Sequence, residues 1–215
     1  MLAINTAFLD ANLALQTEKG VSLKTIDAKA KHSENVLKTI DEMCQELGEN
    51  INNVGVVAVV TGPGSFTGLR IGVAIAQALG CVNENLKYIS ISSLKLMAYK
   101  AIKSNMCDGD FVCVLNALSG LYFVCKFDKS GIMIDKEQMI DQDQFDQITC
   151  QKIALVGDLK SDEFKFVEIT SQDLLEYANL KDSKGEYVSQ EEMLPSYLRL
   201  SQAEDGLLKK SKKDL

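Results

Sequence analysis

A continuous apolar run, from Val54 to Val60, leads without a break into the segment TGPGSFTGLR at residues 61–70. Apolar residues on every position are typical of a strand whose two faces are both covered, as in the parallel sheets of α/β proteins. The residues that follow, 67–82, carry the pattern of a helix, so the segment is a strand–turn–helix unit. Pro63 between two glycines fixes one φ angle in an otherwise permissive loop and gives the turn a defined shape.

The same kind of strand-rich segment occurs twice along the chain. Apolar periodicity and turn residues predict the following elements: strands at 1–6, 11–17, 21–27 and 54–60, helices at 32–47, 67–82 and 90–104, then strands at 110–116, 121–127 and 131–140, a short helix at 142–148, strands at 153–156 and 165–169, and a helix at 171–180. Three strands in close succession open each half. We therefore expect two related lobes, 1–104 and a reduced second lobe, 105–215.

Composition excludes several classes of protein. A net charge of −7 and a pI of about 4.9 disfavour a stand-alone nucleic-acid binder, because phosphate contacts need clustered Lys and Arg. Six cysteines without a CxxC pair, beside a single histidine, give no zinc motif, so we predict no metal. Free thiols and the absence of an export signal or membrane-length apolar run indicate a cytoplasmic protein.

The glycine-rich loop at 61–70 has two possible uses. Backbone N–H groups at the start of a helix can hold a phosphate, but the loop lacks the Lys of a Walker A motif and the third Gly of G-x-G-x-x-G. Gly68, Gly72, Ala76 and Gly80 recur every four residues in the helix that follows. Such small side chains permit close approach either of the chain's own sheet or of a partner's helix, and both alternatives stay open.

No set of residues resembles a catalytic centre. The strands that end at possible phosphate or magnesium positions carry Asn5 and Asn116, and an amide cannot act as a general base. His32 begins the first long helix, but Val36 stands where a second helical ligand would be needed. We therefore predict neither catalytic residues nor a cofactor.

The segment Val57–Gly72 strongly resembles the signature of the TsaB (YeaZ) family. The opening strand, His32-Ser33-Glu34, Pro195-Ser196-Tyr197-Leu198-Arg199 and Gln202-Ala203-Glu204 resemble the same family. The resemblance implies an actin-like (ASKHA) α/β fold of two lobes. It also implies a non-catalytic subunit that binds and activates TsaD, together with TsaE, in forming threonylcarbamoyladenosine beside the tRNA anticodon. It further implies a homodimer when the chain is alone and contact with tRNA only through the complex.

This resemblance assigns two sets of residues. The predicted partner interface comprises Leu37, Ile40, Cys44, Gly68, Leu69, Gly72, Val73, Ala76 and Gly80. The predicted structural motif comprises Gly62, Pro63, Gly64, Ser65, Thr67, Arg70 and Arg199. Family members often carry acidic residues where this chain has Asn5 and Asn116, which further disfavours nucleotide or Mg²⁺ binding. The alternative functions are a free-standing phosphotransferase that uses the actin-like cleft, or a peptidase.

Overall fold

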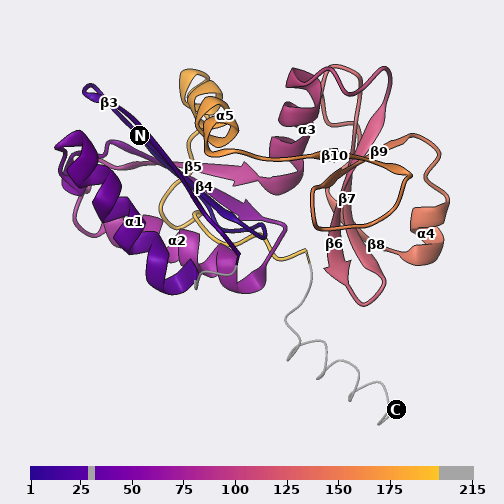
Figure 1. Cartoon of the computed structure of the whole chain (residues 1–215), viewed down its shortest axis with the longest axis horizontal. Helices are drawn as coiled ribbons and strands as arrows, with labels where there is room; N and C mark the ends of the chain where they lie inside the picture. Colours follow the sequence, from indigo (N-terminus) through magenta and orange to yellow (C-terminus); the bar gives the residue numbers. More distant parts are fainter. Residues whose placement is uncertain (29–31, 199–215) are drawn as a thin grey trace, which may run out of the picture.

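The chain folds around two five-stranded sheets of the same topology (Figure 1). The computed structural model describes residues 1–28 and 32–198, and the side chains of these except 32–34. The first sheet has the order β3-β2-β1-β4-β5, with bounds β1 Leu2–Asn5, β2 Ala11–Thr17, β3 Gly20–Ile26, β4 Val56–Gly62 and β5 Lys87–Ser92. The second has the order β10-β9-β6-β7-β8, with bounds β6 Phe111–Leu118, β7 Leu121–Phe127, β8 Gln138–Asp141, β9 Gln151–Leu155 and β10 Phe164–Val167.

Each sheet combines an antiparallel meander of three strands with two parallel strands. In the first sheet β1 pairs antiparallel with β2 and parallel with β4; in the second β6 pairs antiparallel with β7 and parallel with β9. This repeat confirms the predicted α/β fold of two related lobes. The second lobe is the reduced one, because its helix α4, Gln142–Asp146, has 5 residues where α1, His32–Leu47, has 16.

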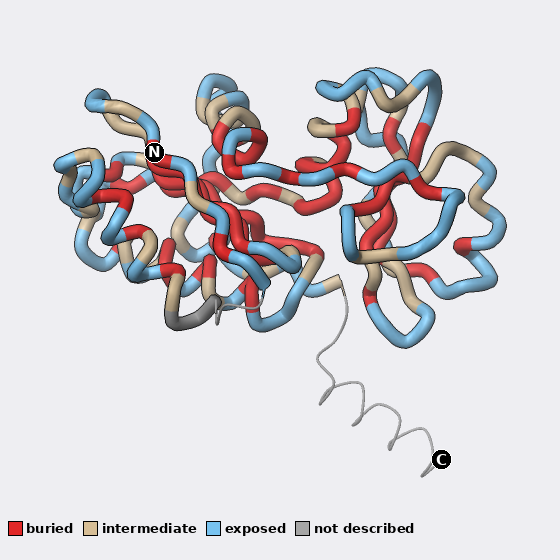
Figure 2. Tube along the Cα trace, in the orientation of Figure 1, coloured by how far each residue is buried: buried red, intermediate tan, exposed pale blue. Residues whose placement is uncertain are grey.

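The helices cover the first sheet on both faces. Helices α1 and α2 (Phe66–Gly80) lie together on one face, while α5 (Ser171–Ser183) lies on the other and α3 (Ser93–Lys103) stands between the two sheets (Figure 1). A one-turn 3-10 helix, Ile51–Asn53, precedes β4. The buried residues follow the strands of both sheets, and the outer surfaces of the helices are exposed (Figure 2).

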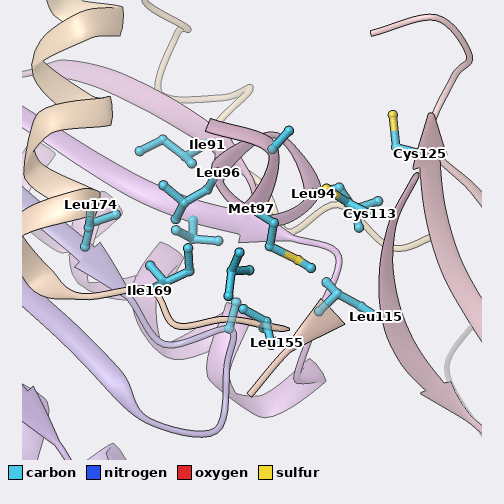
Figure 3. Packing of buried hydrophobic residues seen from close by; sticks show 14 of the residues in the cluster. Ile91, Leu94, Leu96, Met97, Cys113, Leu115, Cys125, Leu155, Ile169 and Leu174 are labelled. Carbon is cyan, nitrogen blue, oxygen red and sulfur yellow. The ribbon is translucent and has the colours of Figure 1, made fainter. Parts of the chain in front are cut away.

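Strand β4 shows why an uninterrupted apolar run was needed here. Val57 and Val59 pack under α1 and α2, whereas Ala58 and Val60 pack on the opposite face, toward α3. The cluster on that opposite face continues into the second lobe, so the two sheets share one core, in which Leu94, Leu96 and Met97 of α3 are central (Figure 3). Burial of this shared core resists separation of the lobes.

One predicted element boundary is corrected by the structure. The predicted helix at 90–104 begins only at Ser93, because residues 87–92 form β5, a buried strand next to β4. The predicted bounds of the second lobe, 105–215, stay a prediction, and part of this range packs on the first sheet. Helix α5 packs on β1, β2 and β3, Val188 pairs with Tyr88, and Met193 is buried in the core of the first lobe.

Candidate functional site

The turn between β4 and α2 is held tightly against the end of β1. The Ser65 N–H donates to the Ala7 carbonyl at 2.9 Å, and the Thr6 hydroxyl donates to the Gly68 carbonyl at 2.6 Å. A Cβ on Gly68 would stand 1.8 Å from the Thr6 carbonyl oxygen, so only glycine permits this approach. The Ser65 hydroxyl caps α2 by accepting from the Gly68 N–H at 3.2 Å.

These contacts argue against phosphate binding by the loop. The N–H groups of Ser65 and Gly68 are both engaged within the chain, by the Ala7 carbonyl and the Ser65 hydroxyl. A phosphate at this helix start would have to displace those partners, since anion binding needs free N–H groups. The loop geometry therefore favours a structural role for Ser65 and its neighbours.

The last described residues of the chain lie on the same turn. The Ser196 N–H donates to the Thr61 carbonyl at 2.7 Å, and Gly62 has φ +128°, where a side chain would also meet the Ser196 carbonyl at 2.8 Å. The peptide bond between Gly62 and Pro63 is cis. Glycine at 62 thus permits both the unusual backbone angle and the close contact with the C-terminal segment.

Arg70 connects this segment to α2 by its side chain. Its Nε donates to the Tyr197 hydroxyl at 3.0 Å, and its guanidinium stacks over the Phe66 ring at 4.1 Å from the centroid. The rings of Phe66 and Tyr197 lie 5.0 Å apart. A planar guanidinium suits this combination of stacking and directed hydrogen bonding better than a Lys ammonium. The predicted Arg199 lies outside the described residues.

Sequence reasoning missed two members of this contact, Phe66 and Tyr197. Phe66 lies between Ser65 and Thr67, which were both selected, and Tyr197 lies within the segment 195–199, of which Arg199 was selected. The signal that could have paired the two segments is the concentration of the chain's only prolines and arginines in them. Two rare residue types shared by distant segments indicate a common structural constraint.

Most residues of the predicted partner interface are buried inside the chain, and the interface itself stays a prediction. Leu37 is 60% exposed, but the other eight are buried: Ile40, Cys44, Gly68, Leu69, Gly72, Val73, Ala76 and Gly80. The small-residue stripe faces the chain's own sheet. A Cβ on Gly72 would stand 2.9 Å from the Thr6 hydroxyl oxygen, and one on Gly80 would overlap the Tyr88 hydroxyl.

A different set of residues is exposed on the same pair of helices. On α2 the exposed positions include Thr67, Arg70, Ala74 and Ala78, which follow one another at helical spacing, and on α1 they include Leu37. We call these five residues the outward face. Two of its members are alanines, so a neighbouring helix could approach α2 closely along this line.

The two asparagines, Asn5 and Asn116, have matching structural roles in the two lobes. The Asn5 side-chain oxygen accepts from the Ala7 N–H at 3.0 Å, and that of Asn116 accepts from the Leu118 N–H at 2.8 Å. Each amide thus holds the backbone two residues further on, where β1 or β6 turns toward the next strand. Asn5 also donates to the Asn12 side chain at 3.1 Å.

A cleft of about 910 Å³ lies between the lobes, next to this turn. Apolar side chains form much of its wall, and its charged lining residues are Asp10, Asp158 and Glu168, with no Lys, Arg or His among them. Asp158 accepts from the Asn116 N–H at 2.8 Å, and burial raises the pKa of its carboxyl. Such a lining is unsuited to an anionic phosphate, because nothing in it supplies positive charge.

No metal centre is formed by the residues that the structure describes, among which no three potential ligands of the His, Cys, Asp or Glu type gather. His32 begins α1, but its side chain lies outside the described set. Within the same part of the chain, no helix combines the length and apolar character needed to cross a membrane.

Comparison with known proteins links this architecture to one family. Residues 20–172 match the family model described as TsaD: tRNA N6-adenosine threonylcarbamoyltransferase. The chain is 32% identical over 105 residues to the tRNA threonylcarbamoyladenosine biosynthesis protein TsaB of Escherichia coli strain K12. These aligned residues cover 49% of this chain and 45% of that protein. With TsaB of Buchnera aphidicola from Acyrthosiphon pisum it is 24% identical over 196 residues, 87% of this chain and 82% of that protein.

The Haemophilus influenzae TsaB is 34% identical over 96 residues, which cover 45% of this chain and 40% of that protein. The chain thus spans less than half the length of the E. coli and H. influenzae relatives that it matches. The solved structure of YeaZ from Pseudomonas aeruginosa superimposes with a TM-score of 0.73 at 20% identity, covering 92% of this chain and 98% of the other. That likeness supports the actin-like fold.

Proposed function

The chain belongs to the TsaB (YeaZ) family, within the wider family of the TsaD model, and from this premise we propose that it is a non-catalytic subunit in the synthesis of tRNA threonylcarbamoyladenosine. In this proposal it binds and activates TsaD, and TsaE joins the complex. The chain contacts tRNA only through the complex. When isolated, it pairs with a second copy of itself through the surface that binds TsaD.

One observation carries the proposal, namely the outward face of α1 and α2. This face leaves Leu37 exposed on α1, and the small side chains of Ala74 and Ala78 exposed on α2. The buried stripe of the same helix already serves the chain's own sheet, so the outward alanines are not needed for that packing. Small residues at a spacing of four favour close packing of a second helix, as in a bundle of two helix pairs.

Co-purification of the chain with TsaD tests the surface. We expect Ala74→Arg and Ala78→Arg to abolish co-elution with TsaD, since a long charged side chain would be desolvated between helices. The matched control is Thr149→Arg, an exposed position on the second lobe, which should leave the complex intact. All three variants should retain the thermal midpoint of the parent chain. Continued co-elution of both alanine variants would refute this interface.

The alternative of a free-standing phosphotransferase has little support in the cleft. Its charged lining is made of carboxylates, and the side-chain oxygens of Asn5 and Asn116 are engaged by backbone N–H groups of their own turns. We therefore expect no saturable ATP binding by the purified chain in the presence of Mg²⁺, measured by calorimetry. Tight Mg²⁺-dependent binding without TsaD would favour the enzyme instead.

A further inference from the structure

Helix α2 has an exposed side that is almost without charge. Arg70 is the only charged residue in the stretch 51–83. Helix positions that face water are usually polar or charged, and depletion of Lys, Glu and Asp beside aromatic residues and Arg is typical of the centre of a protein interface. The exposed positions of α2 have this composition: Phe66, Thr67, Arg70, Ala74 and Ala78.

The guanidinium of Arg70 is held from two directions. It stacks over the Phe66 ring at 4.1 Å from the centroid, and its Nε donates to the Tyr197 hydroxyl at 3.0 Å. These contacts leave the edge formed by the two terminal nitrogens, Nη1 and Nη2. Among the side chains that the structure describes, no carboxylate forms an ion pair with Arg70.

This unpaired cation restricts what can cover α2. Burial of a charge between two proteins without a counter-charge is strongly unfavourable, because the charge loses its hydration. A protein that packs on the outward face therefore has to bring an acceptor to Arg70. A carboxylate matches the free edge of the guanidinium, since its two oxygens can accept two parallel N–H hydrogen bonds.

We propose that the partner of the outward face places a carboxylate, from an Asp or Glu side chain, on the terminal nitrogens of Arg70. This inference rests on the proposed function, because it concerns the same surface. Phe66 and Tyr197 are then positioning residues, which hold the guanidinium ready for the carboxylate and so reduce the entropy lost on binding. The pair also determines specificity, because a surface without an acid at this point would bury Arg70 unpaired.

A phosphate of a nucleic acid fits this position less well. Phosphate backbones are bound by clusters of Lys and Arg, whereas Arg70 is the one cation in residues 51–83 of a chain with a net charge of −7. A single guanidinium between an aromatic ring and a row of alanines is better suited to one carboxylate on a protein surface.

Calorimetric titration of the full-length chain with TsaD tests the pair. Arg70→Gln should raise the dissociation constant at least about 30-fold, because it leaves the partner's carboxylate buried without a cation. Arg70→Lys should raise it about tenfold, since a Lys keeps the charge but lacks the planar fork of donors. The control Lys129→Gln removes an exposed charge from the second lobe and should leave the dissociation constant unchanged.

Two further measurements separate the pair from the contact with the C-terminal segment. Tyr197→Phe removes the acceptor of Nε but keeps the charge of Arg70, so the dissociation constant should rise by no more than about threefold. Amide substitution of the carboxylates of TsaD, one at a time, should identify one position whose effect is coupled to that of Arg70→Gln by about tenfold in a double-mutant cycle. Circular dichroism checks that each variant is folded.

Four results would overturn the inference. An unchanged dissociation constant for Arg70→Gln would do so while leaving the proposed function in place. Equal losses for Tyr197→Phe and Arg70→Gln would assign the effect to residues 195–198 instead of to a carboxylate. Weaker tRNA binding by the assembled complex, with unchanged affinity for TsaD, would assign Arg70 to a phosphate. Absence of binding between the parent chain and TsaD would overturn both the inference and the proposed function.

Discussion

Replacement of Asp173 by Asn should destabilise the chain by an amount that depends on pH. Asp173 lies in the first turn of α5 and its side chain is only 2% exposed. It accepts from Lys100 at 2.7 Å and Lys103 at 3.2 Å, both on α3, and from the Thr170 hydroxyl at 2.6 Å. The variant Asp173→Asn keeps the shape of this side chain and removes its charge, so it isolates the electrostatic part of the α3–α5 contact.

The magnitude follows from the pKa of the carboxyl. Burial alone would raise this pKa, but the hydrogen bonds from Lys100, Thr170 and Lys103 outweigh burial and hold it at about 2, against an ordinary value of 3.8. The difference corresponds to about 2 kcal/mol of folding free energy. Because the pKa is lowered in the folded state, this stability is fully present above pH 3.8 and is lost as the pH falls through 2.

Urea unfolding followed by circular dichroism measures the effect. We expect the free energy of unfolding of Asp173→Asn to be lower than that of the parent chain by about 2 kcal/mol at pH 7 and about 1 kcal/mol at pH 3. The exposed Asp162, which has no ion pair within the described ranges, supplies the control Asp162→Asn, with little change at either pH. A difference that is the same at pH 7 and pH 3 would refute the electrostatic explanation.

Two further predictions concern packing and thiol reactivity. Gly68→Ala should lower the free energy of unfolding, measured in urea, by about 3 kcal/mol, because the new Cβ meets a backbone carbonyl oxygen at 1.8 Å. In the control Gly55→Ala the new Cβ has no atom within 4 Å, so its free energy of unfolding should stay within about 0.5 kcal/mol of that of the parent chain. Equal effects of the two substitutions would contradict the close-approach explanation. Burial raises the pKa of Cys125 to about 12 and also that of Cys113, so in the folded chain at pH 8 iodoacetamide should modify exposed Cys81 far faster than either, as measured by mass spectrometry; comparable labelling of Cys125 would show that the thiol is accessible.

Most elements could be predicted from the sequence because their apolar patterns are strong and local. Strand β5 was missed for a physical reason: the alternation of Ile89-Ser90-Ile91-Ser92 covers only four residues and passes without a break into the apolar pattern of α3. Ser92, which caps α3 by accepting from the Lys95 N–H, marks the true boundary. The return of α5 to the first sheet was missed because it depends on contacts between residues far apart in the chain.

The candidate interface shows a different limit of sequence reasoning. The repeat of Gly68, Gly72, Ala76 and Gly80 correctly indicates close approach, but small residues fit a partner's helix and the chain's own sheet equally well. The structure decides between them, since the Thr6 carbonyl lies directly against Gly68. The exposed alanines on the other side of α2 could not be separated from ordinary surface positions in the sequence, because alanine is common on any helix.

The position of α5 and of residues 188–198 on the first sheet has a consequence for folding during synthesis. The ribosome produces β1 to β5 first, but the face that α5 covers stays open until the last part of the chain has been made. The strands of the second sheet, β6 to β10, are all synthesised before that point. The second lobe can therefore assemble its sheet before the first lobe is complete, so that the order of completion is the reverse of the order of synthesis.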